Sequence, residues 1–298
     1  MQKKKPGLDM MNNALQQGLN GMPNIKRKIK RQIKSRKNLS IIVPCYNEEK
    51  RIGGRLEDLS DEFEAARKNG ALNYEIIVVI NKSTDKTEEI VRSFRKKNKR
   101  ISYIHLPEKG KGLAVREGFK IALQRGADYI GFVDADLSTT GEEYLRLFNS
   151  IGNYDGIIAS RYAKGATVFP KPTFKRFLAS RAFNYFVRML FFFPYKDSQC
   201  GGKIFKRTVV DKIIPHLINT QWAFDVDMLF NIQKFGFKIK EEPTTWSDSD
   251  YSKINFLHAA PFMALSMIRL RILNSPFKPL MDFYDWLPPW IKIHNRFR

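Results

Sequence analysis

Short apolar runs alternate with longer polar stretches through the first half of the chain. Apolar runs at 39–44, 74–80, 101–105 and 129–133 have the length of buried strands. The stretches between them, 47–70, 83–99 and 110–125, are interpreted as helices. This repeated order predicts an α/β fold with a mostly parallel central sheet flanked by helices.

The alternation is less regular after residue 150. Strands are predicted at 156–160 and 237–242, and helices at 173–193, 208–219, 224–235 and 255–274. Ligands of parallel sheets bind at the carboxyl ends of the strands, so the residues that follow Val43, Ile80, His105 and Val133 are the first candidates for a site.

Two acidic residues follow the strand predicted at 129–133. Asp134 and Asp136 are two apart, so in an extended backbone both can face one side. Hard carboxylates suit Mg²⁺ or Mn²⁺, which keep coordination positions open for a diphosphate. A turn with two acidic residues is the alternative for such a pair taken alone.

A second acidic pair, Asp225 and Asp227, begins the helix predicted at 224–235. Residues two apart on a helix do not share a face, so at most one of them is expected in a site. The alternative is a helix start at which the dipole favours acidic side chains.

Several basic residues fit phosphate binding. Arg161 follows the strand at 156–160, and Arg176 and Ser180 are four apart on a predicted helix, so they can hold one phosphate together. Lys111 lies between two glycines at a helix start, where phosphates bind readily. A solvated basic face is the alternative, above all for Lys171 and Lys175.

The formal net charge is +22, from 52 basic and 30 acidic residues, which indicates a polyanionic partner. Residues 1–38 hold eleven Lys or Arg against one Asp. Because this arm lacks aromatic residues for base stacking, no nucleic-acid partner is expected. A narrow apolar stripe at Ile25, Ile29 and Ile33 favours either a cationic interfacial helix or a solvated tail.

The cysteines and the longest apolar stretch indicate where in the cell the protein is expected and whether it spans a membrane. The two cysteines, Cys45 and Cys200, are interpreted as reduced thiols of a cytoplasmic protein. No apolar stretch reaches 18 residues, and the longest candidate, 256–268, contains Pro261 and ends at Arg269. We therefore expect no membrane-spanning helix.

Taken in order, the motifs over about 39–277 resemble glycosyltransferase family 2. The segment 42–48 looks like the opening strand and V-P-x-x-N-E of that family, and 110–116 like its G-K-G-x-A-x-R. Asp134-Ala-Asp136 matches the metal-binding D-x-D, and 159–161 is similar to G-S-R. The later segments 197–203, 222–227, 252–253 and 268–271 resemble its dolichyl-phosphate glucosyltransferase branch.

The resemblance implies a GT-A fold and an inverting transfer of a glucose-type hexose from a UDP-sugar to a polyprenyl or dolichyl phosphate. It implies that the acceptor phosphate is itself the nucleophile. The implied catalytic residues are Asp134, Asp136, Arg161 and Asp225, with Mg²⁺ or Mn²⁺ on Asp136. The implied nucleotide-sugar contacts are Pro44, Asn47, Glu48, Asn81, Lys111, Asp134 and Gln199, and the acceptor phosphate contacts are Arg161, Arg176 and Ser180.

One departure affects the donor. Family members have a pair of Asp residues after the second strand, where this chain has Ile80 and Asn81. An Asn amide can both accept from and donate to uracil, whereas the adjacent donors of guanine favour a carboxylate. Asn81 therefore favours a UDP-sugar.

The organisation expected is a basic arm at 1–38, a catalytic domain at 39–255 and an amphipathic membrane-interface segment at 256–298 with Trp286 and Trp290. The partners expected are a nucleotide-sugar, a polyprenyl phosphate and an anionic membrane surface. We expect a cytoplasmic protein attached peripherally to the membrane. The alternatives are a family-2 enzyme acting on a glycan and an inactive nucleotide-sugar-binding protein.

Overall fold

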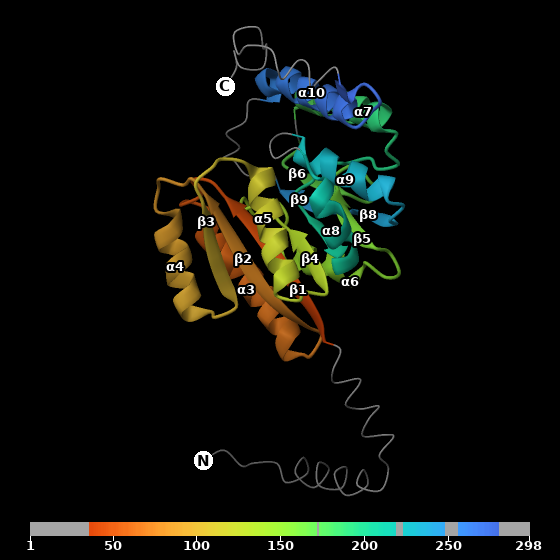
Figure 1. The fold of residues 1–298 in the computed structure, drawn as a ribbon. Helices are drawn as coiled ribbons and strands as arrows, with labels where there is room; N and C mark the ends of the chain where they lie inside the picture. Colours follow the sequence, from red (N-terminus) through yellow and green to blue (C-terminus); the bar gives the residue numbers. More distant parts are fainter. Residues whose placement is uncertain (1–35, 172, 219–222, 248–255, 280–298) are drawn as a thin grey trace, which may run out of the picture.

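The computed structural model describes residues 36–171, 173–218, 223–247 and 256–279. Within these residues, seven strands form the central sheet in the order β3-β2-β1-β4-β7-β5-β8 (Figure 1). All neighbours are parallel except β7, which runs antiparallel to both β4 and β5. The strands are β1 Lys37–Cys45, β2 Leu72–Asn81, β3 Ile101–Leu106, β4 Tyr129–Phe132, β5 Gly156–Ser160, β7 Lys203–Lys206 and β8 Ile239–Pro243.

The central strands are apolar on both faces because helices cover both faces of the sheet. In β2, Ile76, Val78 and Ile80 belong to one buried cluster, and Ile77 and Val79 belong to the other. This two-sided burial explains the continuous apolar runs of the sequence, since an exposed face would require polar residues at alternate positions.

Each face has its own helices. The cluster of Ile76 includes residues of α3 Ile52–Lys68, α4 Thr87–Lys97 and α6 Gly141–Asn149. The cluster of Ile77 includes residues of α5 Lys111–Gln124, α8 Arg207–Ile213 and α9 Phe224–Lys234. The short helix η1 Ile214–His216 continues α8.

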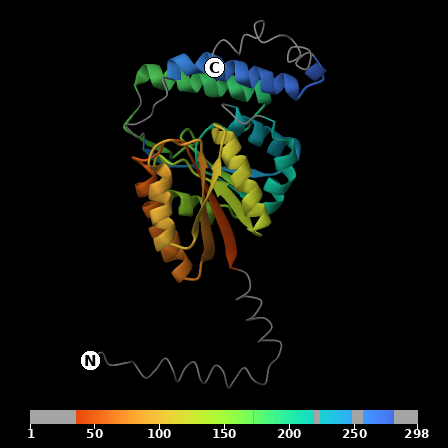
Figure 2. The same ribbon diagram turned by 60° about the vertical axis from the view of Figure 1, so that its left-hand side comes forward.

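Two long helices form an outer layer beyond the strand ends. Figures 1 and 2 show α7 Phe174–Phe191 and α10 Phe256–Leu273 side by side, on the far side of α9 from the sheet. One face of each helix enters the same buried cluster as α5. A two-stranded parallel sheet, β6 Thr167–Phe169 and β9 Thr245–Ser247, lies beneath this layer.

The predicted α/β fold with a mostly parallel sheet is confirmed. The sequence interpretation missed α6, β6, β7 and β9, and it placed the starts of α3 and α4 too early and the end of α8 too late. Strands of three or four residues carry too little periodicity to be distinguished from loops.

Some expectations fall outside the described residues: the arm up to residue 35, Trp222, Ser252, Lys253, Trp286 and Trp290. In the part that is described, none of the helices has the length and apolar character needed to cross a membrane. Cys45 and Cys200 are both buried and unbridged.

Candidate active site

The acidic pair of the predicted site lies at the carboxyl end of β4. Asp136 accepts a hydrogen bond from the Ser138 backbone N–H at 3.0 Å. Asp134 is held on two sides: Lys111 Nζ lies 2.8 Å from its Oδ1, and the backbone of Gly201 lies against its carboxylate. A Cβ atom at residue 201 would collide with that carboxylate, so this close approach requires glycine.

Four charged side chains from distant parts of the sequence form a row beside β4. Lys111 lies between Asp134 and Asp225, with its Nζ 3.8 Å from Asp225 Oδ2. Lys203, which is fully buried, donates to Asp225 Oδ1 at 2.5 Å and to the Cys200 carbonyl at 2.8 Å. We call Lys111, Asp134, Lys203 and Asp225 the charge row.

The charge row has a definite electrostatic pattern. Burial opposes ionisation of Asp225, but Lys203 and Lys111 outweigh burial and lower the pKa of its carboxyl group. Burial also opposes the charge on Lys111, yet Asp134 and Asp225 raise the pKa of its ammonium group. Asp134 differs: burial, together with the neighbouring Asp136, raises its pKa despite Lys111. With Asp136 included, the carboxylates at the β4 end outnumber the ammonium groups of Lys111 and Lys203.

Only one member of the second acidic pair joins this row. Asp227 is buried on α9 and accepts hydrogen bonds from the Ile218 N–H at 2.8 Å and the Asn231 amide at 2.9 Å. Asp227 therefore supports the start of α9 and the loop before it, while Asp225 turns toward the lysines.

The start of α5 lies tightly against α9. Gly110 has φ of 149°, which glycine adopts readily. A Cβ at Gly112 would lie 2.6 Å from Cβ and Cγ of Phe224. The two glycines around Lys111 therefore allow the close packing that places its ammonium group over the β4 end.

The predicted nucleotide contacts at the ends of β1 and β2 are largely engaged within the protein. Asn47 donates from its backbone N–H to Ser83 Oγ at 3.0 Å and accepts the Thr84 N–H at 2.8 Å. The Glu48 carboxylate is held by Arg51 at 2.6 Å. The Asn47 contacts, with a hydrogen bond from the Glu48 N–H to Thr87 Oγ1 at 2.8 Å, tie the β1 loop to the residues after β2. We call the half-buried Pro44 together with Asn47 and Glu48 the wall.

Asn81 is turned inward, and this bears on its predicted role. Its side chain is 2 % exposed. With its amide oriented to satisfy both neighbours, it donates to the Cys45 carbonyl and accepts from the Gly110 N–H at 3.0 Å. A direct contact with a nucleotide base would require the amide to leave both partners. In this structure Asn81 therefore links the end of β1 to the Gly110 loop.

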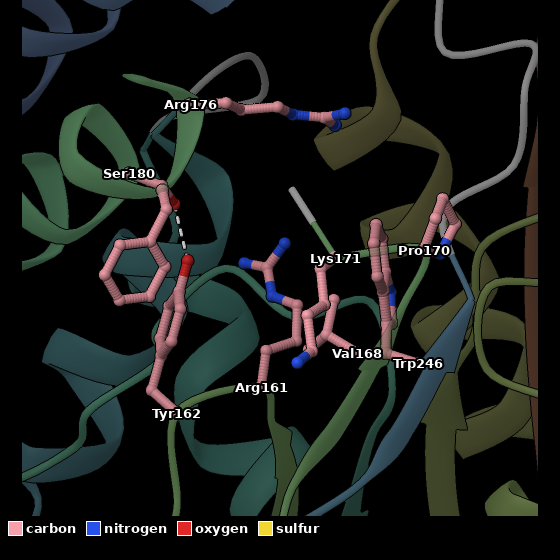
Figure 3. Close-up of a pocket in the computed structure, with 9 residues that line it drawn as sticks. Arg161, Tyr162, Val168, Pro170, Lys171, Arg176, Ser180 and Trp246 are labelled. Atoms are coloured by element: carbon pink, nitrogen blue, oxygen red, sulfur yellow. Dashed lines mark hydrogen bonds between the residues drawn. The ribbon is translucent and has the colours of Figure 1, made fainter. Parts of the chain in front are cut away.

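The predicted acceptor residues Arg161, Arg176 and Ser180 line one cavity of about 300 Å³ (Figure 3). We call it the basic pocket. Its other lining residues are Tyr162, Val168, Pro170, Lys171, Phe177 and Trp246. The Tyr162 hydroxyl and Ser180 Oγ are 2.5 Å apart, which links the β5 loop to α7. Figure 3 shows Arg176 reaching over the cavity and Trp246 standing at its side.

Arg161 is fixed by a buried carboxylate. Its Nε and Nη2 donate to Asp197 at 2.8 and 3.0 Å, and its backbone N–H donates to the same side chain at 3.0 Å. Burial disfavours ionisation of Asp197, but Arg161 outweighs burial and lowers the pKa of that carboxyl group. The guanidinium also lies 5.3 Å from the centre of the Trp246 ring, so its position in the basic pocket is well defined.

One segment, 197–203, connects the basic pocket to the charge row. Asp197 holds Arg161, Gly201 contacts Asp134 and Lys203 holds Asp225. Gln199, the predicted contact on this segment, donates its backbone N–H to Asp197 at 3.3 Å. Sequence reasoning included the segment as a motif but missed the roles of Asp197, Gly201 and Lys203.

Arg55 on α3 is a second residue that the sequence interpretation missed. It is fully buried, and its Nη1 donates to Asp58 at 3.0 Å and to the Thr139 carbonyl at 2.8 Å. It thereby supports the turn that follows Asp136. Helical spacing could have found it, since Arg55 is three residues after Ile52 and four before Leu59, on the face of α3 that is buried.

The acidic pair fits a divalent cation that is shared with a ligand. Among the described residues, no group of three or more His, Cys, Asp or Glu side chains gathers as a complete metal site. Asp134 and Asp136 are hard oxygen ligands, and Mg²⁺ or Mn²⁺ complete their coordination with water and phosphate oxygens. Asp136 has no ion pair among those same residues, so it is the candidate ligand, with Asp134 beside it.

The chain is similar in sequence to known proteins. The chain is 33% identical to dolichyl-phosphate beta-glucosyltransferase of Dictyostelium discoideum, covering 78% of this chain and 73% of that one. It is 30% identical to the enzyme of the same name from Homo sapiens, covering 81% and 78%.

Solved structures share the fold at low identity. Glucosyl-3-phosphoglycerate synthase from Mycobacterium tuberculosis, in complex with Mn²⁺, UDP and glucosyl-3-phosphoglycerate, superposes with a TM-score of 0.59 at 15% identity, covering 81% of each chain. A mannosyltransferase from Pyrobaculum calidifontis in complex with GDP-Man and Mn²⁺ gives 0.55 at 17%, covering 89% of this chain and 74% of that one.

The fold is thus the GT-A fold of glycosyltransferases. The model of the family described as "Glycosyl transferase family 2" matches residues 40–214. With that match and the similarity to dolichyl-phosphate beta-glucosyltransferases, the chain is a glycosyltransferase that belongs to glycosyl transferase family 2.

Proposed function

We propose that this glycosyltransferase moves a glucose-type hexose from a UDP-sugar to a polyprenyl phosphate such as dolichyl phosphate, with inversion at the anomeric carbon. Its relatives' names support a lipid phosphate acceptor and a beta product. The observation that carries the proposal is the basic pocket, which combines Arg161 and Arg176 with the aromatic rings of Phe177 and Trp246. Such a lining suits a phosphate attached to an apolar chain.

On the donor side, we assign the diphosphate to the β4 end and the start of α5. Lys111 offers its ammonium group there, and the first N–H groups of α5 favour an anion. A divalent cation held by Asp136, with Asp134 beside it, would supply charge that stabilises the departing diphosphate. The wall formed by Pro44, Asn47 and Glu48 would border the nucleoside.

The proposed reaction needs no strong base. An oxygen of the acceptor phosphate forms a bond to the anomeric carbon, while the bond from that carbon to the diphosphate oxygen breaks and its electron pair leaves with UDP. A dianionic phosphate carries no proton on the attacking oxygen. Asp225, whose pKa is lowered, is a weak proton acceptor, so its proposed role is to hold Lys111 in place.

Arg161 has a different proposed role. Because Asp197 fixes its guanidinium, Arg161 presents a positioned cation to the incoming phosphate. Arg176 and Ser180 would contact the same phosphate from α7, and Gln199 would lie between donor and acceptor. Preorganised charge of this kind lowers the barrier without reorganisation during the reaction.

The proposed location is the cytoplasmic face of a membrane, to which the enzyme attaches peripherally. The free thiols of Cys45 and Cys200 fit a reducing compartment. The basic N-terminal arm, residues 1–38, would add attraction to anionic lipid.

A donor and acceptor screen tests the proposal. Purified protein with Mg²⁺ or Mn²⁺ would be given UDP-glucose, UDP-N-acetylglucosamine or GDP-mannose, together with a short polyprenyl phosphate. We expect hexosyl phospholipid from UDP-glucose, and a β-linked product by NMR. Transfer only to a glycan would contradict the acceptor assignment, and nucleotide-sugar binding without any turnover would identify an inactive binding protein.

A further inference from the structure

Helix α7 is apolar on two opposite faces. Phe183, Val187 and Phe191, spaced four apart, are buried in the core. The other face remains exposed, with Phe174 at 77%, Leu178 at 57%, Tyr185 at 63% and Met189 at 57%, followed by Phe192 at 73%. A helix in contact with water on one face normally carries polar residues there, so this exposed stripe requires an explanation.

Helix α10 repeats the arrangement beside it. Met263, Met267 and Leu270 are buried, whereas Phe262, Leu265 and Ile268 are exposed. The two helices lie side by side as the outermost layer of the described structure (Figure 2). Their exposed apolar residues therefore belong to one surface, which we call the outer layer.

Charge indicates what this surface contacts. Residues 169–193 contain five Lys or Arg and no Asp or Glu, and residues 256–279 contain three Lys or Arg and no Asp or Glu. The chain as a whole has 30 acidic residues, so their absence from both segments is not a matter of composition. Exposed apolar side chains mixed with cations alone match the interface of an anionic bilayer.

We propose that the outer layer docks on an anionic lipid bilayer with α7 and α10 both lying in the plane of the interface. The apolar stripe of α7 inserts among the lipids, and its cations contact lipid phosphates. The membrane-interface segment expected from sequence, 256–298, contains α10, and the structure adds α7 beside it. A second copy of the chain is the competing occupant of the same face.

The basic pocket adjoins this layer. The role of this adjacency in acceptor binding rests on the proposed function. Phe177 lines the pocket and is also 45% exposed, while Phe174 and Leu178 occur next to Arg176 and Phe177 on the same helix. A polyprenyl phosphate could then place its phosphate in the pocket while its chain stays in the bilayer.

Vesicle flotation of the full chain tests the docking surface. Vesicles of phosphatidylcholine and phosphatidylglycerol, without nucleotide or polyprenyl phosphate, would be used at about 0.1 M and about 1 M salt. High salt screens the contribution of the basic arm and leaves apolar insertion. We expect wild type to float at both salt concentrations, and Phe174→Ser/Leu178→Ser to partition at least about tenfold less at high salt.

The matched control is Tyr154→Ser, which removes an aromatic side chain of 43% exposure that lies outside the outer layer. It should float as wild type does. Unchanged UDP binding and thermal unfolding would show that each variant is folded. Equal flotation of wild type and the double variant at high salt, or no flotation of wild type at all, would overturn the proposal.

Two further measurements separate the alternatives. If light scattering shows a dimer that the double variant dissociates, and vesicles do not bind, a second copy covers this face and the proposal fails. Transfer to a short, water-soluble polyprenyl phosphate should survive in the double variant. Vesicle binding without any transfer in wild type would instead contradict the proposed function and leave the docking surface standing.

Discussion

Lys203, fully buried in β7, donates a hydrogen bond from its ammonium group to the Asp225 carboxylate on α9 at a distance of 2.5 Å. This pair lies behind Lys111, whose ammonium group lies between Asp225 and Asp134. Buried Lys203 thus holds Asp225 in the position from which Asp225 contacts the partly exposed Lys111. Removing one partner of such a pair leaves an uncompensated charge in the interior.

Lys203→Met is therefore expected to lower the free energy of unfolding by about 3–5 kcal/mol, because Asp225 loses its nearest cation. Urea denaturation measures the change. The double variant Lys203→Met/Asp225→Leu should recover most of the stability, since it removes both charges, but not the transfer activity. Full activity in the double variant would show that the pair has no part in positioning Lys111.

Asp136→Ala is expected to reduce kcat by about 10²-fold or more, because a lost metal carboxylate removes several kcal/mol of transition-state stabilisation. The assay would use protein stripped with a chelator and then titrated with Mn²⁺. Asp211→Ala, at an exposed position on α8, is the control and should behave as wild type. Near-normal kcat of Asp136→Ala in restored metal would show that Asp136 is not the ligand.

Arg176→Ala should raise the KM of the acceptor more than the KM of the donor, because a charge-assisted contact to phosphate contributes about 1.5–3 kcal/mol. Steady-state kinetics with each substrate varied in turn measure the split. With a short, water-soluble polyprenyl phosphate and no vesicles, Lys175→Ala removes a neighbouring cation that does not line the basic pocket, and it should change neither constant. Equal increases in both constants for Arg176→Ala would assign this arginine to the diphosphate or to the fold.

Isothermal calorimetry in Mn²⁺ should show tighter binding of UDP than of GDP, as the proposed UDP-sugar donor requires. Because the Asn81 amide is engaged within the protein, this preference would not come from a direct contact of Asn81 with the base. Since Asn81 faces Cys45 and Gly110, we expect Asn81→Asp to leave this preference unchanged. The new carboxylate would face the Cys45 carbonyl and cost about 1–3 kcal/mol of stability. Tighter GDP binding by wild type would reverse the donor assignment, and a switch of preference in the variant would place Asn81 at the base.

The Arg161–Asp197 pair predicts a pH dependence of stability. Asp197 has a pKa below its ordinary value of 3.8 in the folded protein. Its stabilisation is therefore complete above the unfolded-state pKa and is lost as pH falls through the lower folded-state value. Urea midpoints of wild type and Asp197→Asn should differ most near neutral pH and converge below about pH 4. A difference that stays constant over this range would contradict the assignment.

The order of strands and helices followed from the sequence because buried parallel strands and the helices between them leave a strong local pattern. Asp134 and Asp136 could be placed at a strand end for the same reason. Arg176 and Ser180 were predicted to act together from helical spacing, and the structure brings both into the basic pocket with Arg161. Each of these inferences depends on residues close together in the chain.

Contacts between distant segments were decided only by the tertiary structure. The insertion of β7 between β4 and β5 brings Lys203 to Asp225 and Gly201 to Asp134, and no periodicity specifies that insertion. The inward turn of Asn81 depends on where the Gly110 loop passes. The sequence determined which side chains could carry charge, metal or phosphate, but the pairing of those side chains depends on strand order, because two buried charges are stable together only where the fold brings them within contact distance.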